Sequence, residues 1–383
     1  MKDNRPMKVV YIIGDLNRGG AQTQLLNRIS GLAARGYLQH VICLNGTYNR
    51  EVVDALRQTG ASVEIIGRPR LYALIGFWWI VRELRRFRPD LVHTELPGGD
   101  LIGRTLARIA GIRPIVSTVT ARYIDKPRIQ FLLDKATIGW ADRVVFQSPE
   151  IIPFSVSHEG VKSHQIVCIP NSVDLRGAAS TEAAAELRRQ YGGGARTVIG
   201  MVARLHPQKA HPDLLTAFAK VAARQNDLRL WLVGDGPERG RLTAQVRNLG
   251  LDDRVLFAGD RNDARSWTAA MDLFVHPTYF EGLPTAVLEA MAAGKPVITS
   301  PVDGLIGLIE SRVNGWLVEP GDTAALADAI QYVLDHPDDA ARVARAGAER
   351  VWKHYGVTHQ VEAYDRLFRS LVADRAAVSA SDR

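Results

Sequence analysis

Two glutamates eight residues apart, Glu281 and Glu289, flank the segment of the sequence that is best suited to bind a ligand. Pro284 lies between them and favours the first position of a helix, where its missing N–H is not needed. We therefore expect Glu281 and Gly282 on the loop before a helix, and Glu289 about one and a half turns inside it. A helix start offers free N–H groups to an anion, and ionised carboxylates accept hydrogen bonds from hydroxyls. The pattern predicts a sugar phosphate site, although two glutamates at this spacing are also typical of a solvated helix.

Two cations follow the apolar strand expected at Thr197–Met201. Arg204 and Lys209 come just after the carboxyl end of this strand, where open α/β sheets bind ligands. Their charge-assisted hydrogen bonds to a diphosphate would contribute roughly 1.5–3 kcal/mol each. The alternative is a pair of ordinary surface cations. A second strand-to-helix corner follows at Val233-Gly234-Asp235-Gly236-Pro237.

These motifs together resemble glycosyltransferase family four. The resemblance rests on Arg204 with Lys209, on the Gly234-Asp235-Gly236-Pro237 corner and on the segment from Glu281 to Gly294. It extends over roughly residues 7–375 and is more specific in the C-terminal half. Members of this family are retaining enzymes of the glycosyltransferase B fold, in which two Rossmann-like domains face each other across a cleft.

The resemblance implies a role for each of these residues. Arg204, Lys209 and the helix start at Pro284 would stabilise the leaving diphosphate. Glu281 would hold hydroxyls of the donor sugar, and Glu289 would hold the ribose of the nucleoside. The catalytic residues would be Arg204, Lys209 and Glu281, and the donor site would include Gly19, Gly20, Gly234, Gly282, Leu283, Pro284, Thr285 and Glu289.

The N-terminal half holds weaker candidates. Gly19 and Gly20 follow the first expected strand, where paired glycines let the backbone approach a ligand, but a plain turn has the same composition. In the family this loop faces the donor phosphates and the acceptor. The two glycines lack the spacing of the dinucleotide fingerprint, which disfavours a nicotinamide or flavin site. His93, at the end of the fourth expected strand, would either contact the acceptor or simply end the strand.

One position departs from the family pattern. Many relatives place a histidine after the fifth strand, where this chain has Thr120. A neutral hydroxyl cannot replace an imidazole as a base near neutral pH, although it can hydrogen-bond a sugar hydroxyl. Either that histidine only positions the substrate and a threonine suffices, or Arg122 or Tyr123 takes over its role. Thr120 and Arg122 therefore join His93 as acceptor or accessory candidates.

The bulk composition is that of a globular protein of two or three domains. The chain has 383 residues, of which 46% are hydrophobic and 23% charged. Cys43 and Cys168 both fall in short apolar runs, so we expect buried free thiols and a cytoplasmic location. The sequence shows neither a secretory signal nor an apolar stretch long enough to span a bilayer.

The net charge of +7 is not spread evenly. The segment Leu71–Val81 contains two tryptophans and is flanked by Arg68, Arg70, Arg82, Arg85, Arg86 and Arg88. Such a segment could lie on an anionic bilayer surface, which would make the protein peripheral on the cytosolic face of the membrane. The alternative is a core helix with a solvated basic end. Nucleic-acid binding is disfavoured because no recognised module accompanies the charge.

Short β-rich runs alternate with helical stretches in both halves, which predicts two doubly wound α/β domains with parallel sheets. The expected strands are Lys8–Ile13, His40–Leu44, Val63–Ile66, Leu91–His93, Ile115–Thr118, Arg143–Phe146 and Ile166–Ile169, and then Thr197–Met201, Arg229–Val233, Arg254–Ala258, Leu273–His276, Pro296–Thr299 and Gly315–Val318. We place an acceptor domain at residues 1–180 and a donor domain at 192–356, with the joint in the stretch of small residues between them. The resemblance implies that a last helix, 357–375, packs back on the first domain. We expect a disordered tail at 376–383.

Together with these observations, the resemblance implies retaining transfer of a sugar from a nucleoside diphosphate sugar to a hydroxyl of a glycan or lipid-linked acceptor, in cell-surface polysaccharide or glycolipid biosynthesis. Uridine is the first expectation for the nucleoside and guanosine the second. We expect no cofactor and no metal, because the chain has no Asp-x-Asp pair and two cations can neutralise the diphosphate. One alternative is a nucleotide-sugar epimerase of the same fold, which would turn over without an acceptor. The other is a non-catalytic nucleotide-sugar binding protein.

Overall fold

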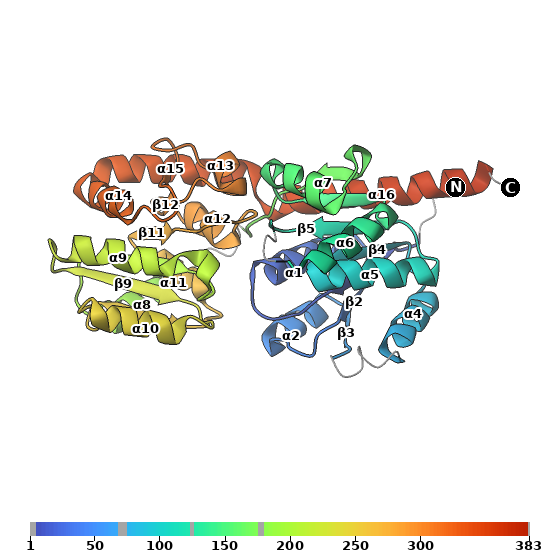
Figure 1. The fold of residues 1–383 in the computed structure, drawn as a ribbon, viewed down its shortest axis with the longest axis horizontal. Coiled ribbons are helices and arrows are strands. Elements are labelled where there is room, and N and C mark those ends of the chain that lie inside the picture. Colours follow the sequence, from blue (N-terminus) through green and yellow to red (C-terminus); the bar gives the residue numbers. More distant parts are fainter. Residues whose placement is uncertain (1–4, 68–74, 123–125, 175–179, 382–383) are drawn as a thin grey trace. The chain divides into compact units, whose positions relative to one another are not determined.

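The computed structural model describes residues 5–67, 75–122, 126–174 and 180–381. It divides into two compact units (Figure 1). Unit 1 comprises Met1–Ser172 together with Val357–Arg383, and unit 2 comprises Val173–Gly356. Each unit is built around one parallel sheet with helices, as the alternation of strand and helix patterns predicts.

The described part of unit 1 contains a seven-stranded sheet in the order β3-β2-β1-β4-β5-β6-β7. Neighbouring strands are parallel throughout. β1 and β2 bury almost every residue, because a doubly wound sheet is covered on both faces. Each strand expected from the sequence is present: β1 (Lys8–Ile13), β2 (Leu38–Cys43), β3 (Ser62–Ile65), β4 (Leu91–Glu95), β5 (Ile115–Val119), β6 (Arg143–Phe146) and β7 (Ile166–Cys168).

Helices cover both faces of this sheet because neighbouring residues of a strand point in opposite directions. Tyr11 of β1 faces the core that it shares with α1, α2 and α16. Ile12, the next residue, faces the core that it shares with α4 and α5. The helices of unit 1 are α1 (Gly20–Ala33), α2 (Arg50–Gln58), α4 (Ile75–Phe87), α5 (Pro97–Ala110), α6 (Arg128–Thr137), α7 (Ile152–Glu159) and α16 (Val357–Ser381).

The described part of unit 2 contains a six-stranded parallel sheet in the order β10-β9-β8-β11-β12-β13. Its strands again match the expected ones: β8 (Thr197–Val202), β9 (Leu228–Val233), β10 (Val255–Gly259), β11 (Leu273–His276), β12 (Val297–Thr299) and β13 (Trp316–Leu317). Its helices are α8 (Thr181–Tyr191), α9 (His211–Ala222), α10 (Arg239–Asn248), α11 (Ala264–Ala270), α12 (Thr285–Ala292), α13 (Asp303–Leu308), α14 (Thr323–Asp335) and α15 (Pro337–His354).

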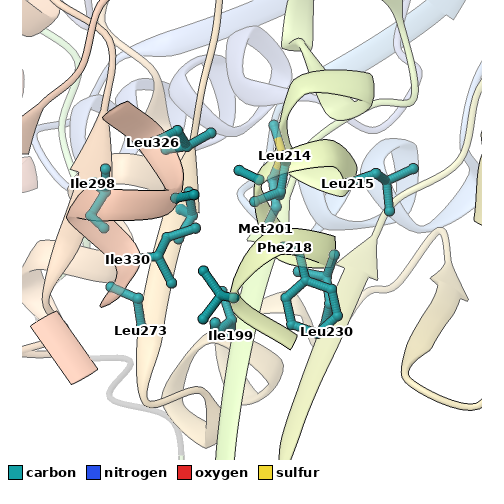
Figure 2. Packing of buried hydrophobic residues seen from close by; sticks show 14 of the residues in the cluster. Ile199, Met201, Leu214, Leu215, Phe218, Leu230, Leu273, Ile298, Leu326 and Ile330 are labelled. Carbon is teal, nitrogen blue, oxygen red and sulfur yellow. The ribbon is translucent and has the colours of Figure 1, made fainter. Parts of the chain in front are cut away.

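Two apolar cores hold the layers of unit 2 together. Figure 2 shows the first core, in which Met201 of β8 and Leu230 of β9 lie among side chains of α9 and α14, such as Phe218 and Ile330. The second core lies on the opposite face, where Trp231 packs with residues of α8, α11, α12 and α13. The strands are therefore fixed between two helix layers, and the loops at their carboxyl ends are held in place.

The last helix belongs to unit 1, although its sequence follows unit 2. α16 packs on α1, and Tyr37 Oη donates a hydrogen bond to Asp365 Oδ1 at 2.7 Å. Gln360 Nε2 donates to Gln24 Oε1 at 2.9 Å, and Ser172 Oγ donates to Gln360 Oε1 at the same distance. These buried polar contacts tie the end of the chain to the first unit.

Two expected boundaries differ from the structure. α16 continues to Ser381, past the helix end expected at residue 375, and the sequence over 376–381 contains several alanines and no glycine or proline. Disorder of the tail stays a prediction. The division between units falls after Ser172 rather than at residue 180. α8 packs on α11 of unit 2, and Arg188 of α8 forms an ion pair with Asp272 at 2.6 Å. None of the described helices has the length and apolar character needed to cross a bilayer.

Candidate active site

The candidate site of unit 2 lies at the carboxyl ends of two neighbouring strands. β8 and β11 pair side by side in the sheet. A single 3-10 turn, η4 (Pro207–Lys209), follows β8 and ends at Lys209, whereas Glu281 lies on the loop between β11 and α12. Ligands bind at this edge of a doubly wound sheet. The strand order thus brings together two side chains that are 72 residues apart in the sequence.

Glu281 is a buried carboxylate that is held through one of its oxygens. Its side chain is 8% exposed, and Oε1 forms an ion pair with the Lys209 ammonium. His276 Nε2 lies 3.2 Å from the same oxygen. Burial acts to raise the pKa of Glu281, but the charge of Lys209 and the hydrogen bonds from His276 and Lys209 outweigh burial and lower the pKa to about 2. Glu281 is therefore ionised throughout the neutral pH range.

The second oxygen of Glu281, Oε2, has no hydrogen-bond partner among the described residues. The contacts from Lys209, His276 and Thr278 all reach Oε1. A carboxylate oxygen accepts about two hydrogen bonds, so Oε2 can accept them from hydroxyl groups. Lys209 likewise has donors to spare, since an ammonium carries three and Glu281 uses one.

Arg204 lies on the loop directly after β8, and its side chain is exposed. It makes no hydrogen bond or ion pair with any residue in the described part of the chain. The structure thus brings Lys209 and Glu281 into contact and leaves Arg204 outside that contact. A role for Arg204 on a diphosphate stays a prediction.

The helix that carries Glu289 begins one residue later than expected. Pro284 is the N-cap of α12 and has ψ 121°, which is extended backbone, so the first helical residue is Thr285. Proline at the cap is compatible with its fixed φ, and ends of helices commonly differ by a residue from sequence-based expectation. Gly282 and Leu283 precede the helix on a loop, as expected, and are buried.

Glu289 is paired with a cation that the sequence motifs did not indicate. Arg265 Nε, on α11, donates a hydrogen bond to Glu289 Oε1 at 2.9 Å. The two side chains are 33% and 15% exposed, so the pair is accessible to a ligand. Arg265 was missed because it lies 24 residues before Glu289 and belongs to no local motif.

The corner after β9 requires glycine because two loops approach closely there. Gly234 has φ +136°, and a Cβ at this position would lie 2.1 Å from the carbonyl oxygen of Ala203. A Cβ at Gly236 would lie 2.3 Å from the carbonyl oxygen of Leu205. The corner therefore supports the loop that carries Arg204. Contact of Gly234 with a donor stays a prediction.

In unit 1, α1 begins at Gly20, and Gly19 precedes it with extended backbone. Both glycines are exposed. Whether they face donor phosphates stays a prediction.

His93 lies in the interior of unit 1, and its contact with an acceptor stays a prediction. Its side chain is fully buried among the rings of Tyr11, Tyr364 and Phe368, and burial lowers its pKa well below the usual value. Its Nε2 lies 2.7 Å from Thr118 Oγ1. His93 does not end the strand, because β4 continues two residues further. A strand pattern does not reveal which face a helix from the far end of the chain will cover.

Thr120 and Arg122 follow β5 and are half-buried, whereas Tyr123 lies outside the described residues.

A small cavity beside the end of β5 is lined by a buried ionic network. Arg104 Nη2 donates to Asp134 Oδ1 at 2.9 Å, and Lys126 Nζ bridges Asp134 and Glu159 at 3.0 and 2.5 Å. Burial raises the pKa of Asp100, at the edge of this network, to about 7. The network was missed because its charges come from several elements.

Comparison with known proteins identifies the class of enzyme. Residues 18–176 match the family described as Glycosyltransferase Family 4, and residues 196–336 match the family described as Glycosyl transferases group 1. The chain is 30% identical over 372 residues to a 2-deoxystreptamine glucosyltransferase of Streptomyces kanamyceticus, covering 88% of this chain and 95% of that protein. The chain therefore belongs to this family of glycosyltransferases.

Two further comparisons agree with this assignment. The chain is 30% identical over 270 residues to the UDP-Gal:alpha-D-GlcNAc-diphosphoundecaprenol alpha-1,3-galactosyltransferase of Escherichia coli, covering 67% of this chain and 69% of that protein. It resembles the crystal structure of Anabaena HepE in complex with UDP-glucose, with a TM-score of 0.84 and 24% identity over 95% of this chain and 100% of that one. This likeness confirms the predicted glycosyltransferase B fold.

Proposed function

We propose that this protein transfers a sugar from a uridine diphosphate sugar to a hydroxyl of a glycan or lipid-linked acceptor, with retention at the anomeric carbon. The observation that carries the proposal is the state of Glu281. Its carboxylate is ionised and anchored through Oε1, while Oε2 receives no hydrogen bond from the described residues. A fixed anionic acceptor beside a cation suits a ligand that combines sugar hydroxyls with phosphates.

The relatives support a uridine nucleotide and a glycan or lipid acceptor. The name of the Escherichia coli relative states UDP-Gal as donor and a diphosphoundecaprenol-linked sugar as acceptor. The Anabaena structure contains UDP-glucose. The proposal includes a role for this protein in cell-surface polysaccharide or glycolipid biosynthesis.

In the proposed step, the bond between the anomeric carbon and the diphosphate oxygen breaks, and the diphosphate keeps the electron pair. The acceptor oxygen bonds to the anomeric carbon on the same face, and its proton passes to the departing phosphate oxygen. Lys209 would stabilise the leaving group, with Arg204 as a second cation. One such contact is on the order of 4 kcal/mol at about 4 Å and an effective dielectric constant near 20, before desolvation. The pair of Glu289 and Arg265 would bind the ribose through the accessible carboxylate.

The proposal is tested first by binding and then by product analysis. Thermal-shift measurements with UDP-glucose, UDP-galactose, UDP-N-acetylglucosamine and GDP-mannose identify the donor. Transfer to a glycan or lipid-linked acceptor is then followed, and proton NMR of the product gives the configuration at the anomeric carbon. Inversion would contradict the retaining step. Turnover of the donor without an acceptor would instead indicate an epimerase, and binding without any transfer would indicate a non-catalytic protein.

Transfer is expected to continue at an undiminished rate in EDTA. Lys209 and Arg204 supply positive charge beside the proposed diphosphate position, which is the role that a divalent cation would otherwise have. The measurement is the initial rate of transfer with and without chelator. Loss of the rate in EDTA, with recovery on adding Mg²⁺ or Mn²⁺, would contradict this expectation.

The membrane contact expected for Leu71–Val81 falls partly on residues 68–74, which lie outside the described residues. The rest of that segment forms α4, which buries Ile80, Val81 and Leu84 and exposes Ile75, Trp78 and Trp79. Arg82, Arg85 and Arg86 are exposed further along the same helix. An exposed apolar surface with adjacent cations suits an anionic bilayer, and we propose that α4 contacts one.

Replacing Trp78 and Trp79 together with alanine is expected to reduce binding to anionic vesicles at least severalfold, because the exposed indole rings would be the main interfacial anchors. Co-sedimentation with phosphatidylglycerol-containing vesicles measures this. Trp352→Ala is the matched control, since Trp352 is 54% exposed in unit 2. Failure of the wild-type protein to co-sediment would end the proposal for α4.

A further inference from the structure

His276 is the last residue of β11 and contacts the carboxylate at the centre of the site. Its side chain is 1% exposed, and Nε2 lies 3.2 Å from Glu281 Oε1. The imidazole ring is stacked against Phe274, with ring centroids 6.0 Å apart and an interplanar angle of 7°. The backbone of His276 is also fixed, because its carbonyl accepts a hydrogen bond from Thr299 Oγ1 at 2.7 Å.

The chemistry of the contact determines the tautomer of His276. An ionised carboxylate only accepts hydrogen bonds, so Nε2 must carry the hydrogen. Nδ1 is buried without a hydrogen-bond partner among the described residues. Burial lowers the pKa of His276, and the Lys209 charge acts in the same direction, against the raising effect of Glu281. His211 also interacts electrostatically with this cluster, and burial lowers its pKa to about 3, with protonated His276 and Lys209 acting in the same direction. At neutral pH both imidazoles are uncharged.

The imidazole of His276 can fix the orientation of the Glu281 carboxylate, which the Lys209 ammonium cannot do. The ammonium is a point charge on a flexible stem with rotatable donors, so it attracts the carboxylate without setting its rotation. The ring of His276 is rigid, and its single donor is fixed by a β-strand, a stacked phenylalanine and a buried environment. Its hydrogen bond therefore selects which oxygen of Glu281 stays anchored and which faces outward.

We propose that His276 is a positioning residue for sugar transfer: it donates Nε2–H to Oε1 of Glu281 and so directs Oε2 toward the hydroxyls of the donor sugar. The proposal rests on the proposed function, in which Glu281 holds that sugar. It predicts that His276 contributes to affinity for a nucleotide sugar and not to affinity for the nucleoside diphosphate alone.

The first test needs no ligand. Nitrogen-resolved NMR of the histidine side chains in the whole protein reports the tautomer, and the His276 signals are identified by their absence from a His276→Gln variant. The expected result at pH 7 is a protonated Nε2 and an unprotonated Nδ1. An Nδ1–H tautomer or a charged imidazolium would overturn the proposal.

The second test compares two substitutions by their reach. In His276→Gln the amide nitrogen can occupy the place of Nε2, whereas the shorter side chain of His276→Asn stops near the place of Nδ1. Isothermal titration with UDP and with UDP-glucose, or with the pair that the donor panel selects, is the measurement. We expect His276→Asn to weaken nucleotide-sugar binding about tenfold and to leave nucleoside diphosphate binding unchanged, because one hydrogen bond to a charged group is lost. His276→Gln should restore most of the loss.

Controls separate this proposal from a structural role and from the function itself. The control variant is His40→Asn. His40 lies in unit 1, is similarly buried and shares a hydrogen bond with Ser62, so this variant should leave the affinities for the nucleotide sugar and the nucleoside diphosphate unchanged. Equal weakening of both ligands by His276→Asn, or no rescue by glutamine, would overturn the proposal. If His276→Asn does not fold, His276→Leu takes its place. Glu281→Gln is the reference variant. If Glu281→Gln weakens binding of the nucleotide sugar and of the nucleoside diphosphate equally, the assigned role of Glu281 is wrong. If Glu281→Gln weakens only nucleotide-sugar binding and His276→Asn does not, only the role of His276 is refuted.

Discussion

Replacing Lys209 with alanine is expected to slow sugar transfer by about 10²–10³-fold, which is typical for loss of one preorganised group that stabilises developing charge. Two effects add in this variant. The leaving diphosphate loses the cation beside it, and the buried carboxylate of Glu281 loses the ion-pair partner that lowers its pKa. The measurement is kcat/KM with the donor identified by thermal shift.

The control for Lys209 is Lys220→Ala. Lys220 lies on α9, the helix that follows the Lys209 turn, and its side chain is exposed. The double variant Lys209→Ala/Glu281→Gln removes both charges and shows how much of the loss comes from an unpaired carboxylate. A rate within about threefold of wild type for Lys209→Ala would exclude Lys209 from the transfer step.

Replacing Glu281 with glutamine is expected to reduce kcat/KM by about 10²-fold while retaining binding of the nucleoside diphosphate. Glutamine keeps the shape of the side chain but removes the charge, so a hydrogen bond from a sugar hydroxyl to an anion becomes one to a neutral amide. Hydrogen bonds to charged groups contribute roughly 1.5–3 kcal/mol, which corresponds to about 10- to 150-fold. Lys209 also loses the partner that fixes its position.

Glu349→Gln on α15 is the control for this substitution, because Glu349 is exposed. Acid unfolding gives an independent check on the charge state. A carboxylate whose pKa is about 2 in the folded protein contributes stability that is fully present above its unfolded pKa and is lost as the pH falls toward 2. Glu281→Gln should lack this part of the acid transition. Unaltered transfer in this variant would refute the role of Glu281 in holding the sugar.

The strands of both sheets were predictable because their burial leaves a local signal. β1 and β8 lie in the middle of their sheets and bury four or more consecutive residues, so their sequences read as apolar runs. β4 was predicted too short because Thr94 and Glu95 are polar, yet both are buried and paired inside unit 1. The apolar pattern cannot reveal a strand whose last residues are stabilised by hydrogen bonds and ion pairs.

Buried ion pairs could not be predicted from the sequence for the same reason. Arg28 of α1 pairs with Glu95 of β4 and stacks over Tyr364 of α16, with the guanidinium carbon 4.6 Å from the ring centroid. Burial alone would lower the pKa of Arg28, but Glu95 outweighs burial and holds it above its ordinary value. Each residue by itself resembles a surface charge, and only the packing of three distant elements makes the group a buried one.

The class of fold, the positions of the strands and several candidate site residues, including Lys209, Glu281 and Glu289, could be predicted from the amino-acid sequence alone. Those features depend on local periodicity and short spacing. Three further features became visible only in the folded protein: the contacts of Glu281 with Lys209 and His276, the pair of Glu289 and Arg265, and the burial of His93. These contacts depend on strand order and on which helix covers which face, and neither has a local signature in the chain.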